Sequence, residues 1–244
     1  MVADPLLLLH PFPMDARFWG PLVAVLDTDR EVLTHELPGF GAAPPSPGWS
    51  IRGAAQSIAH RIAGETPNGR AVIVGLSMGG YVALALVNDA PERVAALVLA
   101  DTRAEADAPA AHNARAGAIA SIREHGSQPF LGDLVPHLLS PRVADTTKRR
   151  VIEISSEQRQ DTFIAALQAL RDRPDRTAEL SKIRVPTLVI VGDDDAVTPP
   201  EAAVTLANRI PGAELTVIPE AGHLCAIEQP AAFADALGRF VRDL

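Results

Sequence analysis

Short apolar runs recur in the first hundred and the last sixty residues of the chain and alternate with segments of helical patterning. Short runs rich in β-branched residues are typical of buried strands, and longer amphipathic stretches are typical of helices. Strands are expected over residues 6–9, 31–37, 71–75, 94–100, 185–191 and 215–218, and helices over 16–26, 51–64, 81–88, from 199 or 200 onward, and 230–241. This order predicts an α/β fold with a mostly parallel sheet and helices on both faces.

The alternation stops between residues 104 and 181, where several helices and no convincing strand are expected. Apolar side chains recur at i, i+3, i+4 and i+7 in the last of these helices, at Phe163, Ala166, Leu167 and Leu170. We interpret that stripe as ordinary helix packing. The flanking blocks, 1–103 and 182–244, are predicted to form one α/β core into which the helical block 104–181 is inserted.

The composition limits the classes of protein to consider. The 244 residues suit one α/β domain with an insertion, and 47% hydrophobic residues suffice for a large core. The net charge of −8 argues against nucleic acid as a partner, because phosphates require a basic face. The single cysteine, Cys225, is expected to be a buried hydrophobe, and no His-x-His or His-Glu-x-x-His pattern is present. We therefore expect no metal and no other cofactor.

The start of the chain carries no predicted leader or membrane segment. Its apolar run at residues 6–9 is very short, is bracketed by Pro5 and Pro11, and lacks a basic stretch before it. No stretch approaches the roughly 20 apolar residues that a membrane span needs. We expect a cytoplasmic protein with no membrane partner.

Residues 75–79, Gly-Leu-Ser-Met-Gly, join a predicted strand to a predicted helix. The Gly-x-Ser-x-Gly pattern is that of a nucleophile elbow, a sharp turn that exposes a serine hydroxyl above a sheet. Free N–H groups and the dipole at the helix N-terminus favour negative charge there. Gly75 and Gly79 lack a Cβ, so strand and helix can approach closely. These flanking elements favour a nucleophilic Ser77 over an incidental serine in a glycine-rich turn.

A serine nucleophile needs a general base, and the chain has seven histidines. Only His223 lies in a loop directly after a late predicted strand, and open α/β sheets build their sites at the C-terminal ends of strands. His60 falls in a predicted helix, and His112, His125 and His137 fall in the inserted block, so we interpret them as surface residues. His223 is the predicted base.

The base needs an acid that orients it, and three adjacent carboxylates follow the predicted strand 185–191. Asp195 is the farthest from the strand and the nearest to the next helix, whose predicted N-cap is residue 198. Asp193 and Asp194 are expected to cap the turn or face water. Asp101, at the end of another predicted strand, competes for the role, with a turn or a pair with Arg103 as its alternative. We favour Asp195.

Hydrolysis by such a serine also needs two N–H donors for an oxyanion. One is expected to be the N–H of Met78, the residue after the nucleophile, and the other is expected in the loop after the first strand. Pro11 and Pro13 in that loop have no N–H, which leaves Phe12. The side chains of Phe12 and Met78 are also expected to form the floor of an acyl pocket.

These pieces together resemble the α/β-hydrolase superfamily over nearly the whole chain. The matching stretches are residues 10–13, 37–41, 75–80, 192–195 with Pro199, and 221–223. Ser77, Asp195 and His223 follow the order Ser, Asp, His of that superfamily. Its acid stands three residues after a glycine, which supports Asp195, and its usual His-Gly is replaced here by residues His10 and Pro11.

The resemblance implies a function. Leu-Pro-Gly-Phe-Gly at 37–41 resembles small carboxylesterases, including pimeloyl-carrier-protein methyl esterases, and residues 75–80 also resemble 3-oxoadipate enol-lactonases. A serine hydrolase is implied that cleaves a small-molecule carboxylic ester through an acyl-enzyme on Ser77, with 104–181 as a helical cap. Enol-lactone, thioester or carbon–carbon bond hydrolysis and peracid formation use the same triad and stay open. A non-catalytic ligand-binding member is disfavoured, because binding alone would not need all three residues.

The cap is expected to decide the acyl length and the alcohol group of the substrate. Candidates for its apolar inner wall are Phe130, Leu131, Leu134 and Leu138, with ordinary core packing as the alternative. Trp19 is expected to anchor its own helix and not to line the pocket.

Overall fold

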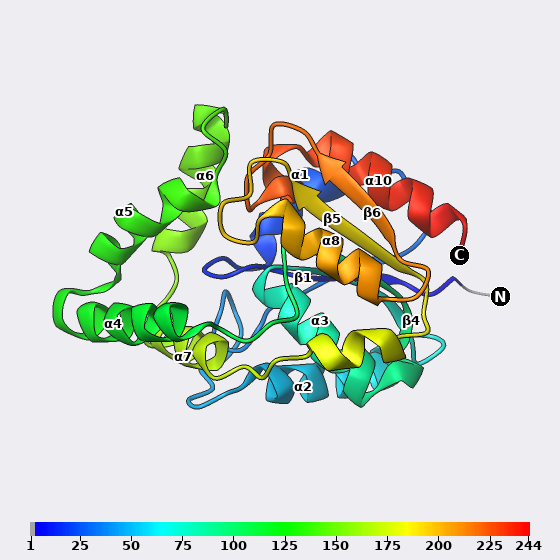
Figure 1. The fold of residues 1–244 in the computed structure, drawn as a ribbon, viewed down its shortest axis with the longest axis horizontal. Helices are drawn as coiled ribbons and strands as arrows, with labels where there is room; N and C mark the ends of the chain where they lie inside the picture. Colours follow the sequence, from blue (N-terminus) through cyan, green and yellow to red (C-terminus); the bar gives the residue numbers. More distant parts are fainter. Residues whose placement is uncertain (1–2) are drawn as a thin grey trace.

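The computed structural model describes residues 3–244 as one twisted parallel sheet with helices on both faces (Figure 1). The strands lie in the order β2-β1-β3-β4-β5-β6, and every neighbouring pair is parallel. Their bounds are β1 Leu6–Leu9, β2 Val32–His35, β3 Ala71–Leu76, β4 Val94–Ala100, β5 Thr187–Gly192 and β6 Glu214–Ile218. The predicted fold class is confirmed, since each predicted strand is present with small shifts at its ends.

The central strands form where continuous apolar runs can be buried on both faces of the sheet. All residues of β1, β3 and β5 are buried, whereas the edge strands β2 and β6 keep exposed positions. The register sets Leu9 beside Gly75, and Ala100 lies between Leu76 and Ile190. The loops after β1, β3, β4 and β5 therefore open at the same edge of the sheet.

Helices cover the sheet as the alternation of the sequence predicts. One face carries α1 (Gly20–Val23) and α10 (Pro230–Arg242), and the other carries α2 (Ile51–Glu65), α3 (Met78–Asp89) and α8 (Pro200–Arg209) (Figure 1). Short turns of helix complete the core: η1 Ala16–Trp19, η2 Pro91–Arg93, η3 Thr177–Lys182 and α9 Cys225–Glu228.

Two details differ from the sequence prediction. The helix expected over 16–26 is a 3₁₀ turn followed by one α-helical turn that ends at Val23. Thr198 is not the N-cap of α8, because Pro199 takes that position. Trp19 is fully buried and packs edge-on against Phe18, with ring centroids 4.9 Å apart, which agrees with an anchoring role.

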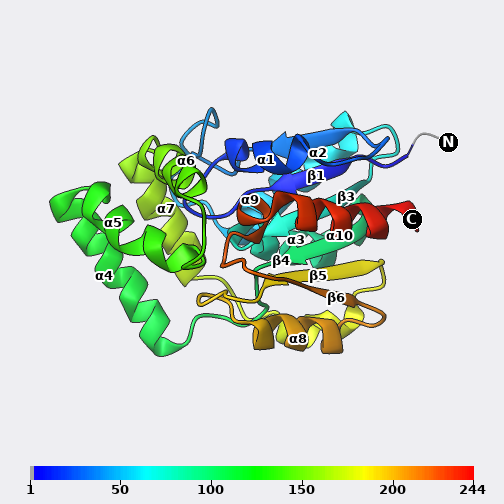
Figure 2. The same ribbon diagram turned by 90° about the horizontal axis from the view of Figure 1, so that it is seen from above.

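Four helices lie between β4 and β5 in the chain: α4 Pro109–His125, α5 Ser127–Leu138, α6 Asp145–Ser156 and α7 Gln160–Arg171. Figures 1 and 2 show them as one lobe at the end of the molecule opposite the C-terminus. We call α4–α7 the four-helix segment. The apolar stripe at 163, 166, 167 and 170 is buried in α7. Helix packing is only part of its role, because Leu167 and Leu170 also line a cavity.

Within residues 3–244, no helix is both long and apolar enough to cross a bilayer. In the same range, no group of three or more His, Cys, Asp or Glu side chains is placed so that it could hold a metal ion.

Candidate active site

Ser77 lies on the turn between β3 and α3 with φ 53° and ψ −111°, a conformation that is strained for a residue with a side chain. Its backbone is fixed on both sides: its N–H donates to the Ala100 carbonyl (2.9 Å), and its carbonyl accepts from the Thr102 hydroxyl (3.0 Å). A Cβ on Gly75 would lie 2.4 Å from the Gly79 carbonyl oxygen, so glycine is required where strand and helix meet. This is the geometry expected of an elbow.

The structure brings Ser77, Asp195 and His223 together. The imidazole Nε2 of His223 lies 2.8 Å from the Ser77 hydroxyl, and its Nδ1 lies 2.9 and 3.1 Å from the Asp195 oxygens. The ionised carboxylate can only accept, so Nδ1–H donates to Asp195 and Nε2 is left to accept the serine proton. All three side chains are buried, with Ser77 the most exposed at 9%.

Asp195 is fixed by three further donors. Its Oδ1 accepts from the N–H groups of Val197 and Thr198, each at 2.8 Å, and its Oδ2 accepts from the Thr198 hydroxyl at 2.6 Å. Burial alone would raise the pKa of Asp195, but the charge and hydrogen bond of His223 and the two hydrogen bonds from Thr198 hold that pKa below its usual value. Asp195 therefore stays ionised beside the imidazole.

The ionised Asp195 acts on His223 in return. Burial alone would lower the pKa of His223, but the charge of Asp195 and its hydrogen bond outweigh burial and raise that pKa above 6.5. The imidazole is therefore more basic than a free histidine, which suits a group that must take a proton from an alcohol.

Asp101, the competing acid, has a different task. It is fully buried, its Oδ1 accepts from the Gly192 N–H (2.9 Å), and its Oδ2 accepts from the Cys225 N–H (3.0 Å). Burial raises the pKa of this carboxyl to about 8, against the effect of its two N–H donors. Both oxygens serve the backbone and not His223, and Arg103 bonds elsewhere, to a backbone carbonyl. Asp101 thus ties the end of β5 to the helix after His223.

Asp193 and Asp194 do not share one role. Asp193 is exposed and accepts from the Ala221 N–H at 3.3 Å, as a turn cap. Asp194 does not simply face water: its Oδ2 accepts from the Ser140 hydroxyl (2.6 Å) and from the Arg142 guanidinium (2.8 Å). Because residues 140 and 142 lie between α5 and α6, Asp194 ties the loop that carries the acid to the four-helix segment.

Glu228 holds the loop that carries His223. Its Oε1 accepts from the N–H groups of Gly222 (3.0 Å) and Leu224 (3.2 Å), on either side of the histidine, and its Oε2 accepts from the Ser140 N–H (2.8 Å). Burial raises the pKa of Glu228, whereas these three donors favour its ionised form. One carboxylate therefore fixes the histidine loop and joins it to the four-helix segment.

The two expected oxyanion donors are the N–H groups of Met78, the first residue of α3, and of Phe12, in the loop after β1. Within the part of the chain that the structure describes, neither the Met78 N–H nor the Phe12 N–H donates to a protein acceptor. Both N–H groups are thus unused by the fold. The Phe12 side chain lines the cavity above Ser77, but the expectation for the Met78 side chain is wrong, because it is fully buried outside the cavity lining.

The loop after β1 is held by a buried histidine. His10 Nε2 accepts from the Leu37 N–H at 2.9 Å, and Nδ1 lies 3.1 Å from the Pro11 carbonyl oxygen. Burial lowers the pKa of His10 to about 4, so this histidine is neutral near pH 7. His10 therefore links the loops after β1 and β2 as an uncharged hydrogen-bonding group.

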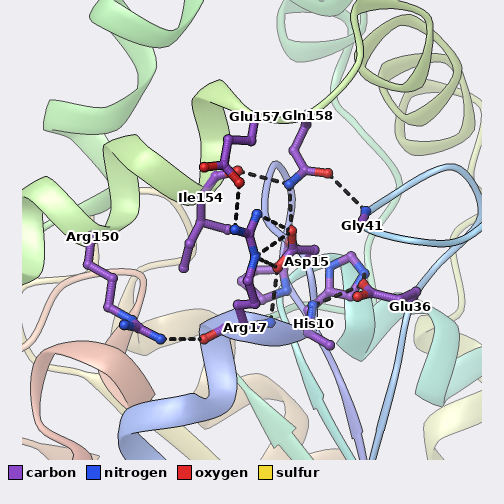
Figure 3. A network of polar contacts seen from close by, with 11 residues as sticks. His10, Asp15, Arg17, Glu36, Gly41, Arg150, Ile154, Glu157 and Gln158 are labelled. Atoms are coloured by element: carbon purple, nitrogen blue, oxygen red, sulfur yellow. Dashed lines mark hydrogen bonds and ion pairs between the residues drawn. The ribbon is translucent and has the colours of Figure 1, made fainter.

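Asp15 holds the same loop from its other end (Figure 3). Its carboxylate accepts from Arg17 Nη2 (2.7 Å) and from the Gln158 amide (2.7 Å), and the Gln158 oxygen accepts from the Gly41 N–H (3.0 Å). Burial alone would raise the pKa of Asp15, but the hydrogen bonds from Arg17 and Gln158 outweigh burial and hold that pKa below its usual value. The carboxylate is therefore ionised. Gln158, just after α6, thus connects the four-helix segment to both loops.

A cavity of about 300 Å³ opens above Ser77. The α/β core contributes five of the residues that line it: Phe12, Ser77, Tyr81, Val197 and His223. The other lining residues belong to α4, α5 and α7. Phe12 meets Phe163 of α7 edge-on at 5.7 Å and Phe130 of α5 at 6.3 Å between ring centroids. Of the four predicted wall residues, Phe130, Leu134 and Leu138 line this cavity, whereas Leu131 lines a separate hollow between α5 and α6.

Comparison with known families agrees with this arrangement. Residues 6–236 match the model of a family described as "Alpha/beta hydrolase family". The chain belongs to the alpha/beta hydrolase family. A relative that is 31% identical and a solved structure that is 32% identical are both named as esterases, so this alpha/beta hydrolase is an esterase-type hydrolase.

Three comparisons place the alpha/beta hydrolase among known proteins. A pimeloyl-[acyl-carrier protein] methyl ester esterase of Neisseria meningitidis strain H44/76 is 31% identical over 241 residues, with 96% of this chain and 91% of that protein covered. A thermophilic esterase from Thermogutta terrifontis, solved with malate bound, is 32% identical, with a TM-score of 0.93 over 99% of this chain and 90% of that one. An enol-lactonase from Burkholderia xenovorans LB400, at 24% identity and a TM-score of 0.84 over 98% and 92% of the two chains, shares the fold.

Sequence reasoning missed three side chains that fix the site of this alpha/beta hydrolase: Thr198, Glu228 and Ser140. The sequence predicts Thr198 only as the cap of α8. Its place three positions after Asp195 is also typical of a local hydrogen bond from a backbone N–H to an aspartate side chain, which the structure contains. Glu228 and Ser140 meet across 88 positions of the chain, so no local pattern could have joined them.

Proposed function

We propose that this alpha/beta hydrolase cleaves small carboxylic esters through an acyl-enzyme on Ser77. The observation that carries the proposal is the continuous hydrogen-bond chain from Asp195 through His223 to Ser77, at 2.9 and 2.8 Å. A serine hydroxyl becomes nucleophilic when a positioned base takes its proton and an acid orients that base.

In the first half of the reaction, Ser77 Oγ attacks the ester carbonyl carbon while His223 Nε2 takes the hydroxyl proton. The carbonyl oxygen becomes an oxyanion, and the unused N–H groups of Phe12 and Met78 are proposed to bind it. The intermediate collapses, the ester C–O bond breaks, and protonated His223 gives its proton to the leaving alcohol. Asp195 stabilises the imidazolium throughout without taking the proton.

In the second half, water replaces the alcohol. His223 takes a proton from the water as its oxygen attacks the acyl carbon, and the same two N–H groups hold the second oxyanion. Collapse breaks the bond to Ser77 Oγ, which regains a proton from His223, and the carboxylic acid leaves. Enol-lactone, thioester or carbon–carbon bond cleavage would use the same three residues on another substrate.

We also propose that residues 104–181 act as a cap over this site. Three of the four helices in that range supply lining residues of the cavity, and Ser140, Arg142 and Gln158 attach the range to the loops of the site. Such a cap would exclude water from the acyl-enzyme and shape the substrate pocket.

The deciding experiment compares the native protein with Ser77→Ala on a panel of 4-nitrophenyl acetate, butyrate and hexanoate. Turnover is expected in the native protein only, together with a single covalent adduct of a fluorophosphonate that maps to Ser77. Asn88→Ala, on the far end of α3, serves as the control substitution. Turnover by Ser77→Ala at the native rate would refute the mechanism.

A further inference from the structure

Helix α4 presents an unusual face to the cavity above Ser77. Its lining residues are Ala111, Ala114, Arg115 and Ala118. Their spacing of i, i+3, i+4 and i+7 places them on one side of the helix. Three alanines leave the space beside α4 open, and the single long side chain among them is a cation.

Arg115 is the only permanently charged residue among the cavity-lining residues that the structure describes. The neighbouring walls are the apolar side chains of α5 and α7, such as Phe130 and Leu167. In a mostly apolar pocket, a few placed polar groups fix the orientation and identity of the ligand. A charge there also acts over a lower dielectric than in water and is a stronger attractor of an anion.

The Arg115 guanidinium is held through its Nε atom. Its Nε donates to Asp107 Oδ2 at 2.5 Å, while Asp107 Oδ1 accepts from Arg173 Nη1 at 2.6 Å. Arg173 is itself buried, with its guanidinium 4.3 Å from the centre of the Tyr81 ring. One carboxylate thus serves two arginines, and within the described residues the Nη groups of Arg115 have no protein acceptor.

We propose that Arg115 binds a carboxylate of the substrate, so that the preferred substrates are half-esters of dicarboxylic acids. This inference rests on the proposed ester hydrolysis at Ser77. The two Nη groups form a planar fork that matches the two oxygens of a carboxylate, and the bond from Nε to Asp107 orients that fork in advance. An ester with a methyl end in place of the carboxylate would leave the fork unpaired.

The test uses pairs of methyl esters with equal numbers of acyl carbons. Monomethyl succinate, glutarate and adipate are compared with methyl butyrate, valerate and hexanoate by titration of the acid released. For at least one pair, the native protein is expected to prefer the half-ester. Arg115→Gln is expected to lower the ratio of kcat/KM, half-ester over alkanoate, by roughly 10- to 100-fold, the range for a lost charge-assisted bond.

Two variants make the result specific. Arg123→Gln removes the same charge from an exposed position of α4 that lines a different hollow, and it should leave the ratio unchanged. Arg115→Lys keeps the charge without the fork and should retain part of the preference. If Arg115→Gln lowered kcat/KM equally on both ester types, Arg115 would have a structural role. If Arg123→Gln lowered the ratio as much as Arg115→Gln does, the preference would come from the electrostatic field of the whole protein. Either result overturns the proposal.

A binding measurement separates this inference from the proposed function. Ser77→Ala is titrated calorimetrically with the preferred half-ester and with its alkanoate partner, at low and high salt. The half-ester is expected to bind more tightly, and less so at high salt because Arg115 is 25% exposed. Turnover by Ser77→Ala would refute the mechanism but not the anion site. Equal binding of both esters by Ser77→Ala, which keeps Arg115, would refute the anion site alone, and this result does not depend on whether Arg115→Gln folds.

Discussion

The side-chain amide of Gln158 donates a 2.7 Å hydrogen bond to the buried carboxylate of Asp15. The two residues are 143 positions apart, and Asp15 lies three positions after Phe12, a proposed oxyanion donor. The oxygen of the same amide accepts from the Gly41 N–H. One side chain of the four-helix segment therefore fixes the loop that carries Phe12, whose N–H is the proposed oxyanion donor.

Gln158→Ala is expected to lower both stability and turnover. It removes the hydrogen bond from the Gln158 amide to the buried Asp15 carboxylate, and a lost hydrogen bond to a charged group costs about 1.5–3 kcal/mol in the free energy of unfolding. The rate should fall because the Phe12 loop loses a restraint. Glu157→Ala is the control: Glu157 is exposed and pairs with exposed Arg17, so its loss should cost less than ~1 kcal/mol. Urea unfolding and kcat measure both effects, and equal results for the two variants would contradict this assignment.

Activity is expected to fall in acid with a midpoint above pH 6.5. His223 must be neutral to take the Ser77 proton, and Asp195 raises the pKa of His223 above that value despite burial. The raised pKa also means that the pair stabilises the fold fully below the pKa of an unfolded histidine and loses this contribution as pH rises through the folded pKa. A profile of kcat/KM between pH 5 and 9 measures the midpoint. A flat profile would contradict a histidine base.

Asp195→Asn separates the two candidate acids. Asparagine cannot hold the imidazole in the required tautomer, and the corresponding change in a serine protease lowers kcat about 10⁴-fold. The pKa of His223 should also fall, because burial is then opposed by less negative charge. Asp101→Asn should affect kcat far less, since both Asp101 oxygens accept backbone N–H groups and neither contacts the imidazole. A larger loss in Asp101→Asn would make Asp101 the working acid.

The sequence predicted the parts of the site that depend on short-range patterns. Strand runs, the turn at Ser77 and the ends of strands where Asp195 and His223 stand are all local features, so their placement could be anticipated. The supports around them could not, because Asp194, Glu228 and Asp15 find their partners on segments far away in the chain. The Met78 side chain was misplaced for a related reason: the pattern identifies its N–H as a donor but does not decide which side of α3 its side chain packs on.

Glu228→Ala should lower kcat with little change in KM. Within residues 3–244, the hydrogen bonds of Glu228 go to the backbone on either side of His223 and to Ser140, and none goes to a side chain that lines the cavity. Its loss should therefore loosen the imidazole and leave the substrate walls in place. Glu228→Gln is the matched variant, because its amide oxygen can still accept from the N–H groups of Gly222 and Leu224, while its NH₂ group can no longer accept from Ser140. We expect kcat to fall by at least tenfold in Glu228→Ala and to recover largely in Glu228→Gln, with both proteins folded by circular dichroism. If the glutamine variant were as slow as the alanine variant, the contact with Ser140, and so the attachment of the four-helix segment, would be the part of Glu228 that matters.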